Sequence, residues 1–295
     1  MKKLIISIQL LLVSLLAFSQ ETVYPAKAQT ETITITNATI HVGNGTVITN
    51  GFVTFENGKI KAVGQSNPPA GGKVIDAKGK HVYPGLILSV SQLGLVEVNS
   101  VRATVDHTEL GLYNPNIRSI VAYNSDSKVI GTLRSNGVLF ANVVPQGATI
   151  SGSSTVVQLD AWNWEDATYK ADGQIHMNMP SLLPRPSRFA AFLGQAESRS
   201  TADQVKEALN RVEEIKQFFH QAKAYHKEAT HAKTNLKFEA TKGLFAKKQK
   251  LFVHCDIVKE MLVAIDFAKE FGFDVVIVGG SESWQIADLL KQNNI

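Results

Sequence analysis

Short runs in which apolar and polar residues alternate occupy positions 32–83. The clearest are Ile33–Thr36, Thr39–Val42, Gly51–Phe55 and Lys59–Val63. Alternation with a period of two is typical of strands that bury one face. Between these runs lie Gly43-Asn44-Gly45 and Asn57-Gly58, whose residue types tolerate the positive φ angles of tight turns. The pattern predicts a small antiparallel β-sandwich domain over 32–83.

From position 84 onward the apolar runs become more continuous. They are Leu86–Val90, Val138–Val144, Thr155–Leu159, Leu251–Cys255 and Asp274–Val278. Strands of this kind are buried on both faces, as in parallel sheets covered by helices. Thr201–Lys233 shows the three- and four-residue apolar spacing of a helix, and Ser200 with Asp203 fits a capping box. We therefore expect an α/β architecture over 84–295.

The first twenty residues have the pattern of a targeting segment. Lys2 and Lys3 precede the apolar run Leu4–Phe18, and Ala17-Phe18-Ser19 supplies small residues for cleavage. The run of about 15 residues is shorter than the roughly 20 that span a bilayer, so 1–20 is interpreted as a secretory signal and not as an anchor. A polar linker, 21–31, follows. We expect an exported protein, periplasmic or secreted, with no membrane span after cleavage.

Composition and charge narrow the choice of partners. The 44% of hydrophobic and 19% of charged residues are typical of a globular protein. Loss of Lys2 and Lys3 with the signal lowers the formal charge from +4 to +2, which is too small to indicate nucleic acid as a partner. Cys255 is the single cysteine, so no internal disulfide can form.

Three segments resemble the amidohydrolase superfamily. The string Val74–Ile87, with its Pro84-Gly85 step, is similar to the point where a small β domain leads into the first barrel strand. Leu251–Asp256 and Val275–Gly280 are similar to the fifth and sixth strands of the imidazolonepropionase-like and dihydroorotase-like branches. The resemblance implies a TIM-type (β/α)8 metal-hydrolase barrel and a divalent metal such as zinc. It also implies metal-dependent hydrolysis of C–N bonds in a small-molecule or peptide substrate.

The chain departs from this family at the metal ligands. Where the family has two histidines one residue apart after the first strand, this chain reads Val90-Ser91-Gln92. Where the family often has another histidine at the end of the sixth strand, this chain reads Gly279-Gly280-Ser281. Valine has no lone pair, and a glutamine carbonyl is a poor zinc ligand. His254 keeps its ligand position, and strand alternation places Asp256 on the same side. His254 is either a residual metal ligand or a core histidine hydrogen-bonded to its neighbour.

The predicted substrate-binding residues are Asp160, Trp162, Trp164 and Asp256. The first three follow an apolar strand, at a position where a barrel loop would line the substrate pocket. The alternative is that both indoles pack beneath a surface loop.

Other candidate motifs predict no chemistry. The loop Pro145–Gly152 lacks the lysine of a phosphate-binding loop. Cys255 and His254 face opposite sides of a strand, which disfavours a nucleophilic pair. The histidines of the long helix are spaced so that they point to different sides of it, and they are His220, His226 and His231.

These patterns predict an incomplete barrel. Ser283–Gln292 is helical in pattern and the sequence then reaches Ile295, which leaves two strands of an eight-stranded barrel without residues, so we expect a longer gene product. The leading hypothesis is an amidohydrolase-family protein that lacks a complete catalytic site in this segment. The alternative is a non-catalytic exported binding or scaffold subunit on the same fold. Either could form a homo-oligomer.

Overall fold

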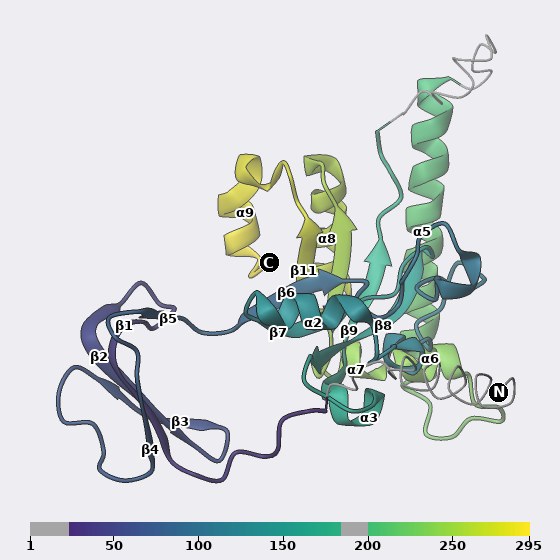
Figure 1. Cartoon of the computed structure of the whole chain (residues 1–295). Coiled ribbons are helices and arrows are strands. Elements are labelled where there is room, and N and C mark those ends of the chain that lie inside the picture. Colours follow the sequence, from purple (N-terminus) through teal and green to yellow (C-terminus); the bar gives the residue numbers. More distant parts are fainter. Residues whose placement is uncertain (1–23, 184–199) are drawn as a thin grey trace, which may run out of the picture. The chain divides into compact units, whose positions relative to one another are not determined.

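The structure, a computed structural model, describes residues 24–183 and 200–295, so the predicted signal peptide lies outside the described residues. The chain forms two compact units, which divide between Pro84 and Gly85 (Figure 1). Asp160–Trp162 are grouped with the first unit. Residues 24–31 contain no helix or strand. Within the described ranges, no helix is both long enough and apolar enough to span a bilayer.

The first unit is a single five-stranded sheet. Its strands are β1 (Ile33–His41), β2 (Val47–Glu56), β3 (Lys59–Gly64), β4 (Lys73–Asp76) and β5 (His81–Val82). β2 pairs antiparallel with both β1 and β3, through the two predicted turns. β4 and β5 both pair parallel with β1. Ala38, Ile40 and Val53 form the small apolar core of this unit.

The prediction of an antiparallel β-sandwich for this unit was wrong. A tight turn such as Asn57-Gly58 reverses the chain and makes an antiparallel pair, but β4 follows a longer connection that lets the chain run parallel to β1. The result is one mixed sheet, and the described residues of this unit form no second sheet against which it could pack.

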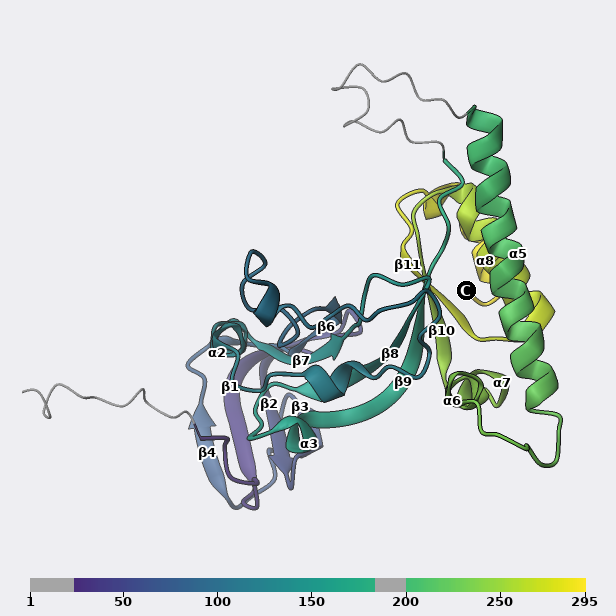
Figure 2. The same ribbon diagram turned by 90° about the vertical axis from the view of Figure 1, so that its right-hand side faces the viewer.

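The second unit contains a curled six-stranded sheet (Figure 2), whose strands follow one another across the sheet in chain order. The strands are β6 (Leu86–Ser91), β7 (Val138–Val143), β8 (Ile150–Gln158), β9 (Thr168–Asn178), β10 (Lys250–Cys255) and β11 (Val275–Gly279). The α-helices are α2 (Lys128–Ser135), α3 (Trp164–Ala167), α5 (Thr201–Tyr225), α6 (Leu236–Ala240), α7 (Lys242–Phe245), α8 (Val258–Phe271) and α9 (Ala287–Gln292). Short 3₁₀ turns are η1 (Arg102–Thr104), η2 (Ser119–Ala122) and η3 (Ser283–Ile286).

Strand β8 departs from the parallel order expected of a (β/α)8 barrel. It runs antiparallel to β7 and β9, whereas β6–β7, β9–β10 and β10–β11 are parallel pairs. Residues 144–149 connect β7 to β8, and so short a connection cannot hold the crossover helix that a parallel pair needs. The loop before β8 therefore lies at the carboxyl-terminal edge of the parallel strands, and the loop after β8 lies at the opposite edge.

Helices α5 and α8 cover one face of β9, β10 and β11. Phe219 of α5 is fully buried and contacts the rings of Phe267, Phe271 and Phe273. The Ser200 hydroxyl accepts the Asp203 N–H at 3.1 Å, so the predicted helix start is confirmed. The helix ends at Tyr225 and not at Lys233, because the chain folds back and stacks the His231 ring on Tyr225.

Candidate functional site

A cavity of about 370 Å³ lies at the carboxyl-terminal edge of the parallel strands in the second unit. This edge is where α/β barrels bind their ligands. The loop before β8, the end of β9, helix α5 and strand β10 all contribute to its wall. The lining residues are Leu112, Pro145, Gln146, Gly147, Ala148, Thr149, Asn178, Met179, Pro180, Arg211 and His254.

Strand β10 positions His254 in this wall. Leu251, Val253 and Cys255 are buried in the core shared with the helices, so alternation turns Phe252 and His254 to the other face. The Met179 N–H donates to the His254 carbonyl at 3.1 Å, which joins β10 to the end of β9. Burial raises the pKa of the Cys255 thiol to about 12, with Glu260 and Asp256 adding to the shift. The thiol is therefore protonated and unsuited to act as a nucleophile.

His254 is hydrogen-bonded to a second histidine, His176 of β9. The His254 Nε2 and His176 Nδ1 atoms are 2.9 Å apart, and the His176 side chain is fully buried. On its other side, His176 Nε2 lies 2.8 Å from the Ser154 hydroxyl of β8, which donates to Gln174 Oε1 at 2.8 Å. A chain of four side chains thus runs from the cavity wall into the sheet, and we call it the His176 relay.

The direction of the last hydrogen bond fixes the protons of the whole relay. Because the Ser154 hydroxyl donates to the Gln174 carbonyl oxygen, it accepts from His176 Nε2–H. His176 Nδ1 then carries a lone pair and accepts from His254 Nε2–H. The remaining ring nitrogen of His254, Nδ1, is therefore an acceptor on a residue that lines the cavity.

Burial keeps both imidazoles neutral. Burial, together with a smaller contribution from charge repulsion by His254, lowers the pKa of His176 from 6.5 to about 3. Burial also lowers the pKa of His254. A protonated His176 would lose the lone pair that accepts from His254, so the relay requires the neutral form.

Asp256 does not join His254. It is exposed beyond the end of β10, and its carbonyl accepts the Glu282 N–H at 3.0 Å and the Ser281 hydroxyl at 3.2 Å. Asp256 Oδ1 lies beside Gly279 at the end of β11. The hydrogen-bond partner of the His254 side chain is therefore His176, which is distant in sequence, and not Asp256.

Asp160, Trp162 and Trp164, the predicted tryptophan loop, do not form one site, because they belong to different units. Trp162 stacks on Tyr24 with ring centroids 5.6 Å apart, and Asp160 Oδ2 accepts the Ala26 N–H, both within the first unit. Trp164 belongs to the second unit, where it begins α3 at the amino-terminal edge of the parallel strands. The premise that this loop lines the barrel mouth was wrong, because β8 is antiparallel.

Sequence reasoning missed His176, Ser154 and Gln174, and it considered the loop 145–149 only as a phosphate-binding loop. The sequence does indicate a strand here, because polar and apolar residues alternate in Gln174-Ile175-His176-Met177-Asn178. Ile175 and Met177 are buried in the helix-side core, so the polar residues between and beside them belong to the cavity side. Of the three histidines expected on one long helix, only His220 lies in α5, and His226 and His231 follow its end. Their hydrogen-bond partners differ: His220 pairs with Glu270, His226 with Thr241 and His231 with Glu228.

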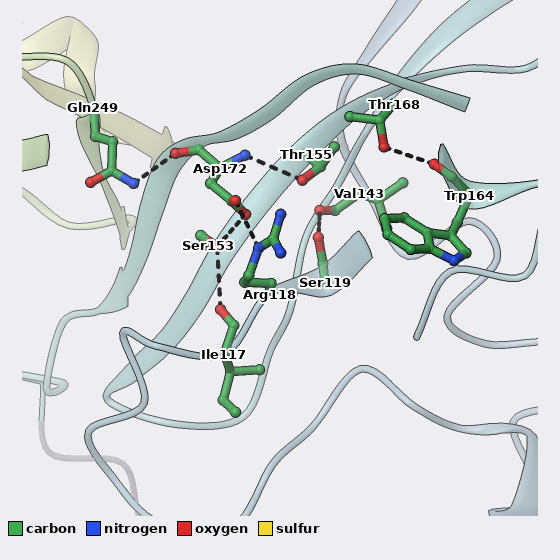
Figure 3. A network of polar contacts seen from close by, with 10 residues as sticks. All are labelled: Ile117, Arg118, Ser119, Val143, Ser153, Thr155, Trp164, Thr168, Asp172 and Gln249. Atoms are coloured by element: carbon green, nitrogen blue, oxygen red, sulfur yellow. Dashed lines mark hydrogen bonds and ion pairs between the residues drawn. The ribbon is translucent and has the colours of Figure 1, made fainter. Parts of the chain in front are cut away.

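An ion pair holds the segment that follows η1 against the sheet (Figure 3). Arg118 Nε lies 2.7 Å from Asp172 Oδ2, and the Ser153 hydroxyl donates to Asp172 Oδ1 at 2.9 Å. Gln249 Nε2 donates to the Asp172 carbonyl, and the Ser119 hydroxyl donates to the Val143 carbonyl, each at 2.7 Å. These contacts fix the strand segment that carries Ser153 and its neighbour Ser154.

The donor set does not fit a catalytic zinc ion, which takes three protein ligands and one open position. Val90 and Gln92 occupy the two positions where the resemblance implies imidazoles, and Nε2 of His254 is used by the His176 relay. In residues 24–183 and 200–295, no group of three or more His, Cys, Asp or Glu side chains is placed to hold a metal ion. No step of catalysis through such an ion can be derived from these residues.

Neither the protein-family models nor the curated proteins that were searched include a match. Among solved structures, an amidohydrolase from Thermotoga maritima MSB8 is similar with a TM-score of 0.68 and 25% identity, and the similarity covers 89% of this chain and 68% of that one. A prolidase solved with N-methylphosphonate-L-proline has a TM-score of 0.37 at 14% identity, over 84% of this chain and 66% of that one, which is too low to carry an argument. The first similarity supports placing this chain in the amidohydrolase superfamily.

Proposed function

We propose that this protein is a member of the amidohydrolase superfamily whose described residues bind a small molecule or peptide without a catalytic metal centre of their own. The observation that carries the proposal is the His176 relay, which uses the one imidazole kept from the expected ligand set as a hydrogen-bonding group. The cavity volume of about 370 Å³ falls in the range of small-ligand pockets, roughly 300–1,000 Å³.

The chemistry of the cavity wall indicates what it would bind. His254 Nδ1 offers a lone pair to an N–H or O–H group, as the proton positions in the relay require. Arg211 of α5 also lines the cavity. One of its terminal nitrogens pairs with Glu207 at 2.6 Å, and the other N–H groups of the guanidinium can bind a carboxylate. A ligand with a hydrogen-bond donor and a carboxylate, such as an amino acid or short peptide, satisfies both groups.

The second candidate function is metal-dependent hydrolysis of a C–N bond, with a divalent metal such as zinc. The retained His254 and the similarity to the Thermotoga maritima amidohydrolase favour it. The replacements at Val90 and Gln92 weigh against it. We also propose that the protein is exported, on the pattern of residues 1–20.

Thermal shift measurements with amino acids, N-acetyl amino acids and dipeptides test the binding proposal. A ligand at 100 times its Kd stabilises the protein by about 2.7 kcal/mol, which raises the melting temperature by several degrees. His254→Ala should abolish this shift, and Trp164→Ala should leave it intact. Loss of the shift in Trp164→Ala alone would instead favour the tryptophan loop as the binding site.

A further inference from the structure

We propose that His41, His81 and Tyr83 form a surface site for a first-row transition-metal ion, with Cu²⁺ as the preferred occupant. The site lies in the first unit, so it is independent of the function proposed above.

Strand pairing places the three side chains on one face. In the parallel pair of β1 and β5, Thr39 lies opposite His81 and Ile40 opposite Val82. Because side chains alternate along a strand, the buried Ile40 faces the core and His41 faces the other way, together with His81 and Tyr83. Tyr83 is 62% exposed, so an ion and its waters can reach the group.

The donor atoms of these side chains lie close together. His41 Nε2 is 2.8 Å from His81 Nδ1, and the Tyr83 hydroxyl is 3.5 Å from the same His81 nitrogen. Two ligands on neighbouring positions of one ion, with bonds of about 2.0 Å, place their donor atoms about 2.8–3.3 Å apart. The imidazole pair thus already has the spacing of two ligands to a single ion.

The three rings stack on one another. The His41 ring lies 4.1 Å from the Tyr83 ring at an interplanar angle of 13°, and it lies 5.1 Å from the His81 ring. Modest side-chain rotations would turn both nitrogen lone pairs toward one ion, at the expense of a single exposed hydrogen bond. Imidazole nitrogens suit Cu²⁺, Ni²⁺ and Zn²⁺, and Cu²⁺ forms the most stable complexes of the three.

Titration of the full chain with glycine-buffered Cu²⁺, followed by calorimetry and by electron paramagnetic resonance, tests this site. We expect one tightly bound equivalent whose spectrum shows coupling to two imidazole nitrogens. His41→Ala and His81→Ala should each weaken binding by more than tenfold, since even outer-shell changes cost about 10- to 100-fold. His231→Ala is the matched control and should leave the titration unchanged, and Tyr83→Phe should alter the spectrum while keeping both nitrogens.

The same data can overturn the proposal. A tight equivalent that persists in the His41→Ala/His81→Ala double variant would place the copper elsewhere. A wild-type spectrum with fewer than two imidazole nitrogens would do the same, and it does not depend on the folding of any variant. A failure here would leave the cavity proposal intact, because Cu²⁺ binding in the first unit involves neither His254 nor His176.

Discussion

At the scale of single residues, the protons of the His176 relay are the most specific feature of the site. His176 lies between Ser154 and His254, and both of its ring nitrogens are engaged. The hydrogen bonds require Nε2–H tautomers at both histidines. ¹⁵N-resolved NMR of the imidazole side chains should show this pair of neutral tautomers at pH 7, and a charged ring at either position would contradict the relay.

The lowered pKa of His176 predicts how stability depends on pH. In the unfolded chain this imidazole titrates near 6.5, whereas in the folded protein it titrates near 3. The unfolded state therefore binds more protons between these values, and the free energy of unfolding falls as the pH falls from 6.5 toward 3, by up to about 1.4 kcal/mol per pH unit. Urea unfolding at pH 7.5 and 5 should show a smaller pH dependence in His176→Gln than in the wild type. An equal dependence in both proteins would show that His176 is not held neutral.

Ser154→Ala tests the buried end of the relay. The substitution leaves His176 Nε2–H without an acceptor in a fully buried position, which costs about 1–3 kcal/mol. Ser135→Ala, on the exposed last turn of α2, is the control and should change stability by less than about 0.5 kcal/mol. Equal denaturation midpoints for the two variants would argue against the hydrogen bond.

At the scale of elements, the approach of the segment 113–118 to β8 depends on Gly152. This glycine has a φ of +130°, and an added Cβ would lie 2.5 Å from the Ile117 carbonyl oxygen. Gly152→Ala should therefore destabilise the fold by more than about 1 kcal/mol, since it combines backbone strain with a steric clash. Gly131→Ala in helix α2 meets no atom within 4 Å and should stabilise the protein by up to about 1 kcal/mol. Thermal denaturation of both variants measures the contrast, and a stable Gly152→Ala would disprove the close approach.

Helix α5 is fixed by its buried aromatic side chain. Phe219→Ala should cost about 3–5 kcal/mol, because the ring is fully buried among other phenylalanines. Leu209 on the same helix is 47% exposed, so Leu209→Ala should cost much less. Similar losses in chemical denaturation would contradict the packing of Phe219 against α8 and Phe273.

Element types were more predictable than strand directions. The alternating runs of 32–83 and the apolar runs near 138–144 and 251–255 all became strands, because local periodicity depends only on which face is buried. The reversed β8 and the parallel β4 could not be found in this way, because strand direction is set by how the chain returns to the sheet. His254 was placed on the correct face by alternation, whereas its bond to His176 joins residues 78 positions apart.

At the scale of the whole molecule, the two units differ in the potential metal ligands that they bring together. The first unit brings two imidazoles and a phenol together on an exposed sheet face. The chain is similar in fold to an amidohydrolase, and the second unit has a cavity at the carboxyl-terminal edge of its parallel strands, where His254 is engaged in a neutral hydrogen-bond relay. The similarity of fold therefore supports membership of the amidohydrolase superfamily. The proposal that the cavity binds a ligand without a catalytic metal rests on the His176 relay.

Metal content of the protein purified without chelators tests this account most directly. The measurement is elemental analysis of the His41→Ala/His81→Ala variant, with and without the further change His254→Ala, so that the surface site does not contribute. We predict the same, substoichiometric content of zinc and other transition metals in both proteins. One equivalent of metal that is present with His254 and absent after His254→Ala would contradict the account and restore metal-dependent hydrolysis as the better hypothesis.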